Sequence, residues 1–142
     1  MGMQGQVLCA NAPAAHFDAE PFHVIAESEL AAQPLVAVGV CLDPFCSAQF
    51  VPSRPWQRYC SAACRKRDEA EFRRIGQKAA PALLAWQMGR YARPGPLADL
   101  SRVGRNYYSR LAADWLRDRR ARSSQNGRVV DIKSFQDGKA TE

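Results

Sequence analysis

The chain has 142 residues, of which 46% are hydrophobic and 24% charged, a composition typical of a small globular protein. Its longest apolar run, Leu35–Leu42, is too short to span a bilayer, and no basic stretch followed by an apolar core marks a secretory leader. We therefore expect a cytoplasmic protein without membrane contact, in a reducing compartment where clustered thiols bind metal more often than they form disulfides.

The charge is divided unevenly along the chain. Residues 1–53 contain five acidic residues and no basic ones, whereas residues 54–142 contain all twenty basic residues against nine acidic ones. Such asymmetry predicts a polyanionic partner for the basic half, although docking of the two halves on each other would also explain it.

The first half of the chain predicts little regular structure before a small β-hairpin. Residues 1–34 are acidic and show little periodicity, so we expect a poorly structured segment with at most a short helix at Ile25–Ala32. Pro52-Ser53-Arg54-Pro55 is a turn signal that joins two short strands as a hairpin. The strands predicted here are Leu35–Val40, Ala48–Val51 and Trp56–Tyr59.

The second half is predicted to be helical. Ser61 is suited to cap a charged helix that runs to about Lys78, and Pro81 suits the first turn of a second helix that ends near Tyr91. A third helix, Leu97–Arg120, carries an apolar stripe at three- and four-residue steps. The expected parts are therefore an N-terminal segment (1–34), a cysteine-bearing module (35–78), a helical hairpin (79–122) and a tail that forms a short strand or an arm (123–142).

Four of the five cysteines, Cys41, Cys46, Cys60 and Cys64, form two close pairs, C-x4-C and C-x3-C. Zinc takes four thiolates at tetrahedral corners about 2.3 Å from the metal, and a full set of cysteines leaves no open coordination position. Cys64 falls in the first turn of the predicted helix, where the helix dipole favours a thiolate. We expect a structural zinc site, with unligated thiols, a redox pair and an iron–sulfur cluster as the alternatives.

The motif around these cysteines resembles a known group of proteins. Cys41-Leu42-Asp43-Pro44-Phe45-Cys46 followed by Arg58-Tyr59-Cys60-Ser61 and Cys64-Arg65 is similar to small bacterial and phage treble-clef zinc fingers, and more distantly to the CGNR-type finger of bacterial transcription regulators. Arg65-Lys66-Arg67 follows Cys64 where the CGNR type begins Gly-Asn-Arg. The resemblance implies an α+β fold, a treble-clef finger of knuckle, β-hairpin and helix, followed by a mainly α-helical region. It also implies DNA binding.

Basic residues on the predicted hairpin and helices are the candidates for a nucleic-acid interface. Their arginines suit phosphate contacts, while ion pairs such as Arg67–Glu71 and Glu69–Arg73 along a solvated helix are the competing interpretation. The candidates are Arg54, Arg58, Arg65, Lys66, Arg67, Arg73, Arg74, Arg117, Arg119 and Arg120.

The sequence offers no catalytic set. Its two histidines, His16 and His23, precede the cysteines, and no nucleophile–base arrangement or phosphate-binding glycine loop is recognisable. We therefore predict a zinc-finger DNA-binding regulatory protein and not an enzyme. The alternative is a phage or mobile-element adaptor that binds a host protein, and a nuclease is a distant third.

Overall fold

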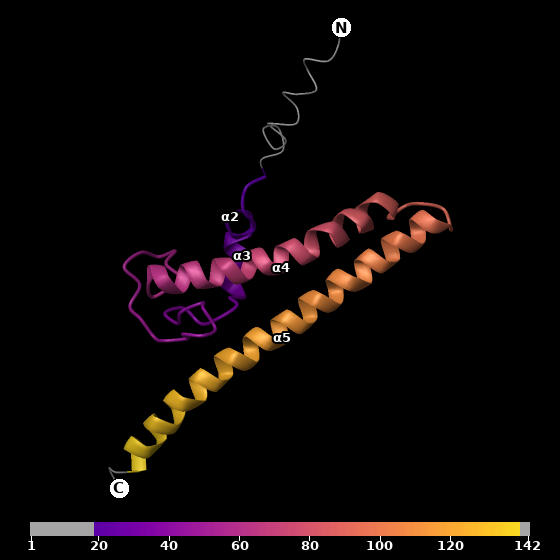
Figure 1. The fold of residues 1–142 in the computed structure, drawn as a ribbon. Coiled ribbons are helices and arrows are strands. Elements are labelled where there is room, and N and C mark those ends of the chain that lie inside the picture. The colour runs from indigo at the N-terminus through magenta and orange to yellow at the C-terminus, as the bar shows by residue number, and fades with distance from the viewer. Residues whose placement is uncertain (1–18, 140–142) are drawn as a thin grey trace. The chain divides into compact units, whose positions relative to one another are not determined.

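The computed structural model describes residues 19–139, with the side chains of its last helix described as far as residue 124. The described residues divide between Leu35 and Val36 into two compact units. The first unit holds two short helices, α2 (Phe22–Ile25) and α3 (Glu27–Ala32). The second begins with a stretch without helix and continues into two long helices, α4 (Ala62–Gly89) and α5 (Pro96–Lys139) (Figure 1).

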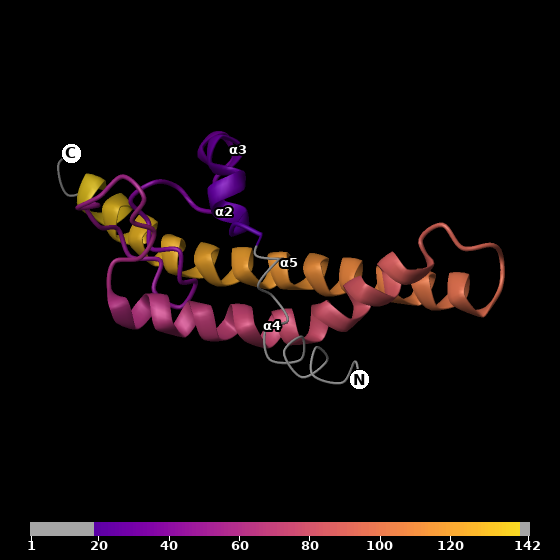
Figure 2. The same ribbon diagram turned by 90° about the horizontal axis from the view of Figure 1, so that it is seen from above.

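The two long helices form an antiparallel hairpin (Figures 1 and 2). Small residues allow their backbones to approach closely: a Cβ added at Gly104 would lie 2.6 Å from the carbonyl oxygen of Ala82, and one at Gly89 would collide with that of Leu97. The Ser101 hydroxyl donates a hydrogen bond across the contact to the Trp86 carbonyl oxygen, at 2.6 Å. Side-chain size therefore sets how tightly this hairpin packs.

Helix α4 begins where the sequence predicts and ends later than predicted. The backbone N–H of Cys64 donates to the Ser61 hydroxyl at 3.2 Å, which confirms the predicted cap. The break expected between Lys78 and Pro81 is absent, because Pro81 lies inside one continuous helix of 28 residues. Packing along α5, at the buried Ala82 and the facing Gly104, offsets the hydrogen bond that a proline removes from a helix.

The predicted α+β, treble-clef fold is wrong. The described residues contain no β-sheet and no β-hairpin; the predicted strands are reduced to one isolated antiparallel bridge, Val40 with Gln49. The backbone cannot extend a ladder there, since Gly39 has a φ of 82° and Ser47 a φ of 49°, both left-handed. Pro52 and Pro55, the first and last residues of the predicted turn, also lack the N–H group that a ladder needs.

The predicted end of the last helix is also wrong. The sequence predicts a helix that ends at Arg120 and a tail from residue 123 that forms a strand or an arm, yet α5 runs on to Lys139. Serine and asparagine are poor but tolerated helix formers, and a helix already seated on α4 extends at little cost per residue.

The core of the second unit is small and half polar. Its buried apolar side chains include Cys41, Leu42, Pro44, Cys64 and Ala82, and its buried polar or charged ones are Asp43, Asp68, Ser101 and Arg119. Many large apolar side chains remain exposed instead. Hydrophobic burial is thus a limited source of stability here, and polar contacts and cysteine chemistry must supply more. No helix in the described part of the chain is long and apolar enough to cross a membrane.

Candidate metal centre

The segment before α4 is folded so that its two cysteine pairs meet. The backbone N–H of Leu42 donates to the Arg58 carbonyl oxygen at 2.8 Å, which ties the first pair to the approach of the second. The carbonyl oxygen of Asp43 accepts from the N–H groups of Cys46 and Ser47, at 3.0 and 2.9 Å, and so closes the turn between Cys41 and Cys46.

The four predicted ligands lie together. The sulfur atoms of Cys41, Cys46, Cys60 and Cys64 are all within 4.8 Å of one another, and two of the separations, Cys46–Cys60 and Cys60–Cys64, are 3.6 Å. Four sulfurs about 2.3 Å from a tetrahedral ion would be about 3.8 Å apart, so the arrangement fits a single ion. The predicted clustering is confirmed, and the four thiols are positioned to bind a metal such as zinc.

Hydrogen-bond donors lie beside two of the sulfur atoms. The N–H of Cys60 points to the Cys41 sulfur at 3.5 Å, and Arg67 Nη2 lies 3.8 Å from the Cys64 sulfur. Cys64 is in the first turn of α4, at the positive end of the helix dipole. Burial nevertheless raises the pKa of the Cys41 thiol to about 12, so a metal ion must displace its proton in order to bind.

A buried carboxylate, Asp43, joins the cysteine turn to α4 through Arg67. The Asp43 side chain is fully buried and accepts hydrogen bonds from Arg67 Nε, at 2.7 Å, and from the backbone N–H of Phe45, at 3.1 Å. The bond to Asp43 raises the pKa of Arg67, despite some desolvation. Arg67, predicted to contact nucleic acid, is therefore engaged in holding the cysteine turn.

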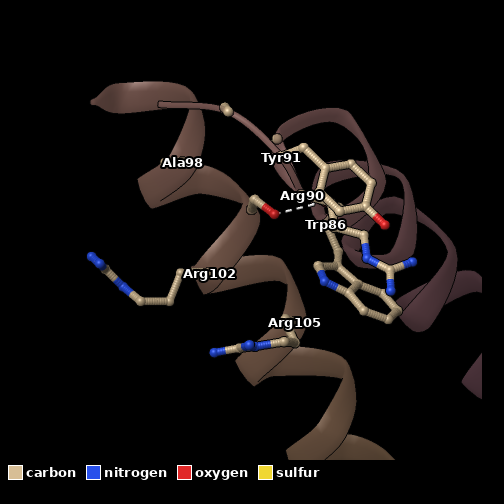
Figure 3. A pocket seen from close by; sticks show the side chains of 9 residues that line it. Trp86, Arg90, Tyr91, Ala98, Arg102 and Arg105 are labelled. Carbon is tan, nitrogen blue, oxygen red and sulfur yellow. Dashed lines mark hydrogen bonds between the residues drawn. The ribbon is translucent and has the colours of Figure 1, made fainter. Parts of the chain in front are cut away.

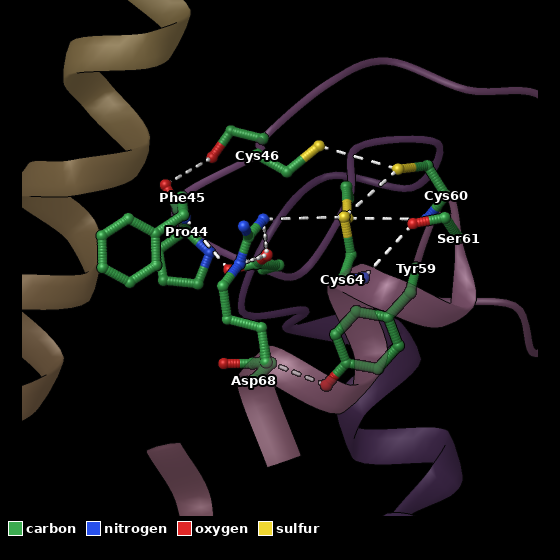
Figure 4. A network of polar contacts seen from close by, with 12 residues as sticks. Pro44, Phe45, Cys46, Tyr59, Cys60, Ser61, Cys64 and Asp68 are labelled. Atoms are coloured by element: carbon green, nitrogen blue, oxygen red, sulfur yellow. Dashed lines mark hydrogen bonds and ion pairs between the residues drawn. The ribbon is translucent and has the colours of Figure 1, made fainter. Parts of the chain in front are cut away.

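A second buried carboxylate, Asp68, joins α4 to α5. Arg119 is 5% exposed and donates to both Asp68 oxygens, at 2.6 and 3.1 Å, as well as to the Leu42 carbonyl oxygen at 3.0 Å and to Glu71 at 2.6 Å. Tyr59 donates its hydroxyl to Asp68 at 2.8 Å (Figure 4), and burial together with this bond raises the pKa of Tyr59. One guanidinium thus connects α5, α4 and the turn that carries Cys41.

The charge of Arg119 is retained within this network. Burial alone would lower its pKa, but the hydrogen bonds and charges of Asp68 and Glu71 outweigh that effect and raise it. Its guanidinium also stacks on Phe72 and Trp115, with 5.1 and 5.6 Å to the ring centroids. Arg119 is placed as an internal structural residue and not on the surface where nucleic acid would meet it.

Arg122 continues the network toward the cysteine turn. Its Nη2 donates to Glu71 at 2.7 Å and pairs with Asp118 at 2.8 Å, while its guanidinium lies 5.0 Å from the Phe45 ring centroid. Arg67 lies over the same ring at 5.5 Å. Phe45, in the turn between Cys41 and Cys46, therefore contacts cations from both α4 and α5.

The other predicted interface residues remain at the surface. Arg65 pairs with Glu69 at 3.9 Å and Arg117 with Asp114 at 3.2 Å, in place of the helix pairs that the sequence suggested. The remaining candidates are exposed and have no carboxylate partner among the described side chains: Arg54, Arg58, Lys66, Arg73, Arg74 and Arg120.

The acidic side chains that the structure describes in the second unit, within residues 36–124, are all paired with arginines. Each of the seven carboxylates within residues 36–124 is in an ion pair with an arginine. Seventeen basic residues lie in the same range, and eleven of them are exposed without a described carboxylate partner. Seventeen basic and seven acidic residues give this range a net charge of +10, which is carried mainly by cations without a described carboxylate partner.

Comparisons of the chain with protein-family models, with curated proteins and with solved structures find no match. The resemblance of the cysteine motif to bacterial zinc fingers therefore stays a prediction.

Sequence reasoning missed the two buried carboxylates. Asp68 follows Cys64 by four residues and so lies on the same face of the helix as that cysteine. Asp43 lies between two ligands, where its backbone and its side chain both serve the turn. The positions of Asp43 and Asp68 relative to the cysteines are the sequence feature that could have identified these two carboxylates.

Proposed function

We propose that the protein binds nucleic acid, with DNA as the first candidate, through exposed cations on a helical hairpin whose base is held by a zinc-bound cysteine cluster. One observation carries the proposal: every carboxylate within residues 36–124 is paired with an arginine, and eleven exposed cations are left without a described acidic partner. Nucleic-acid phosphates are the usual partner of such an uncompensated arginine-rich surface.

Zinc is the ion proposed for the four cysteines. Four thiolates with no other ligand are the usual donor set of structural zinc, and the 4.8 Å span of the sulfur atoms leaves space for one ion. Bound there, zinc would supply a rigid crosslink between the turn at Cys41–Cys46 and the start of α4. The complete ligand set gives it no open position for catalysis, so we propose a binding protein and not an enzyme.

The proposal is tested by the salt dependence of binding. Zinc-loaded protein should shift a labelled 20-base-pair duplex in a gel, and the affinity should fall steeply between about 50 and 200 mM salt, since counterions are released from each contacted phosphate. The double substitution Arg73→Gln/Arg74→Gln should weaken binding and reduce the salt slope by about 1.8 if both residues contact phosphates.

The control keeps the fold and changes charge elsewhere. The double substitution Arg65→Gln/Glu69→Gln removes an exposed ion pair without changing the net charge, and should leave affinity within about twofold. Absence of binding to duplex and single-stranded nucleic acid at 50 mM salt would refute the proposal.

A protein-binding adaptor is the second candidate, because apolar side chains are exposed on the same hairpin. Leu84 is 67%, Met88 66% and Val103 61% exposed, which is unusual for three large apolar residues on neighbouring helices. Association with a protein partner that persists after Arg73→Gln/Arg74→Gln but is lost after Leu84→Glu/Val103→Glu would favour this function over nucleic-acid binding.

A further inference from the structure

A groove opens at the turn end of the helical hairpin, where the end of α4 meets the first turns of α5 (Figure 3). Its volume is about 470 Å³, within the range of small-molecule sites. At 1.5 Å per helical residue, Gly89 lies about 37 Å along α4 from Cys64, so the groove is distinct from the cysteine cluster. Its lining includes two aromatic residues and three arginines: Trp86, Tyr91, Arg90, Arg102 and Arg105.

The floor of this groove is firmly built. Gly89 has no space for a Cβ against the Leu97 carbonyl oxygen, and Ser101 donates to the Trp86 carbonyl oxygen at 2.6 Å. The Trp86 ring is stacked on Tyr108, with 5.3 Å between the ring centroids and 28° between the planes. The aromatic wall is therefore already in place before any ligand arrives.

The groove is cationic and its arginines are accessible. No acidic residue lines it. Arg90 Cζ is 5.2 Å from the ring centroids of both Trp86 and Tyr91, and a guanidinium stacked in this way keeps its N–H edge for a ligand oxygen.

Two further arginines that line the groove come from α5. Arg102 and Arg105 project from successive turns of the helix (Figure 3), and Arg105 has no carboxylate partner among the described side chains. Arg102 pairs with Asp99 at 3.1 Å, but both side chains are 61% exposed. Such a pair contributes only about 0–1 kcal/mol, so a phosphate can displace it.

A ligand for this groove needs an anionic group and a flat ring. The guanidinium fork of an arginine binds two oxygens of a phosphate or carboxylate at once, and Tyr91, which is 84% exposed, offers a ring face to a base. Phosphate contacts combined with stacking on aromatic side chains are how proteins hold unpaired nucleotides.

We propose that this groove binds one nucleotide unit, with its phosphate on Arg90 and Arg105 and its base stacked on Tyr91. The assignment rests on the proposed function, since it gives the nucleic-acid surface a specific pocket for an unpaired nucleotide. A free mononucleotide presents the same chemistry, so the experiment must separate the two sources.

The experiment measures binding of a fluorescent ten-residue oligothymidylate, thymidine monophosphate and inorganic phosphate to the full zinc-loaded chain. Arg90→Gln/Arg105→Gln should weaken oligothymidylate binding at least tenfold more than Arg73→Gln/Arg74→Gln, a double substitution of equal charge loss on the proposed general phosphate-binding surface. Tyr91→Ala should weaken oligothymidylate binding by about 5- to 150-fold, as expected for one lost stacking contact, and Tyr91→Phe should keep most of the affinity.

The outcomes distinguish this inference from the proposed function. If both double arginine substitutions weaken oligothymidylate binding equally, or if Tyr91→Ala does not weaken it, the groove is not the binding site, and the proposal of nucleic-acid binding stands. Thymidine monophosphate binding that depends on Tyr91, without oligothymidylate binding, supports the groove with a free nucleotide as its ligand. Binding of inorganic phosphate as tightly as the nucleotide overturns base recognition, and no binding of any probe or of duplex overturns both proposals.

Discussion

At the scale of single residues, two buried carboxylates govern how the charges of this protein are used. Asp43 and Asp68 are almost completely buried, and each forms an ion pair with an arginine that is far away in the sequence. A buried carboxylate without its partner is costly, since neither water nor another donor replaces the lost bonds. The arginines Arg67 and Arg119 are accordingly fixed by the fold.

Replacing Arg119 should destabilise the protein strongly. Arg119→Met leaves the Asp68 carboxylate buried with only Tyr59 as a described donor, and we expect a loss of about 3–5 kcal/mol in the free energy of unfolding. Arg119→Lys should recover less than half of this loss, because an ammonium cannot reproduce the two-pronged bond to Asp68. Chemical denaturation measures both variants.

The matched control for that prediction is the next residue in the chain. Arg120 is exposed and has no described carboxylate partner, so Arg120→Met should change the free energy of unfolding by no more than about 0.5 kcal/mol. Equal effects of the two methionine substitutions would show that the Arg119 network contributes little.

Metal affinity should depend strongly on pH. Because the pKa of Cys41 is raised to about 12, its thiol is protonated at neutral pH until a metal displaces the proton. The apparent affinity for zinc should therefore rise with pH, by at least about tenfold per unit between pH 6 and 8. Competition with a chromophoric chelator measures this slope, and an affinity that stays constant across this range would argue against proton displacement.

At the scale of elements, the hairpin of α4 and α5 depends on glycines at specific contacts. Gly104 faces the backbone of Ala82, and the position of its missing Cβ is only 2.6 Å from that carbonyl oxygen. Gly76, in the same hairpin, has nothing within 4 Å of the equivalent position. Substitutions at these two glycines therefore distinguish the effect of close helix packing from the effect of helix propensity.

Alanine substitutions at these glycines should have opposite effects. Gly104→Ala forces the helices apart and should lower the free energy of unfolding by about 1–3 kcal/mol. Gly76→Ala gains helix propensity without a clash and should raise it by about 0.5–1 kcal/mol. Thermal unfolding followed by circular dichroism measures both; stabilisation by Gly104→Ala would mean that the helices are not in close contact there.

At the scale of the whole molecule, local patterns in the sequence predicted local features. The cysteine spacing predicted a four-thiol cluster, and Ser61 predicted the start of α4, because both depend on a few neighbouring residues. The predicted β-hairpin does not form, also for a local reason: residues with left-handed backbone conformation and prolines interrupt its strands. Pro81 was misread because packing against α5 outweighs its intrinsic preference for a helix end.

Long-range pairs were beyond the reach of sequence reasoning. Arg119 and Asp68 are 51 residues apart, and nothing in their local context distinguishes Arg119 from its exposed neighbour Arg120. Only the crossing of α5 over the cysteine turn decides which arginine is buried. The distribution of charge on the surface therefore follows from the fold and cannot be counted from composition.

The central claim is that four cysteines bind one metal ion on which the second unit depends. The most direct test determines bound metal by elemental mass spectrometry and follows thermal unfolding of the same sample before and after chelation. We predict one zinc per chain, and a melting temperature that falls by at least about 10 °C once the metal is removed. Protein prepared with ample zinc that carries no metal, or that melts at the same temperature without it, would contradict the claim.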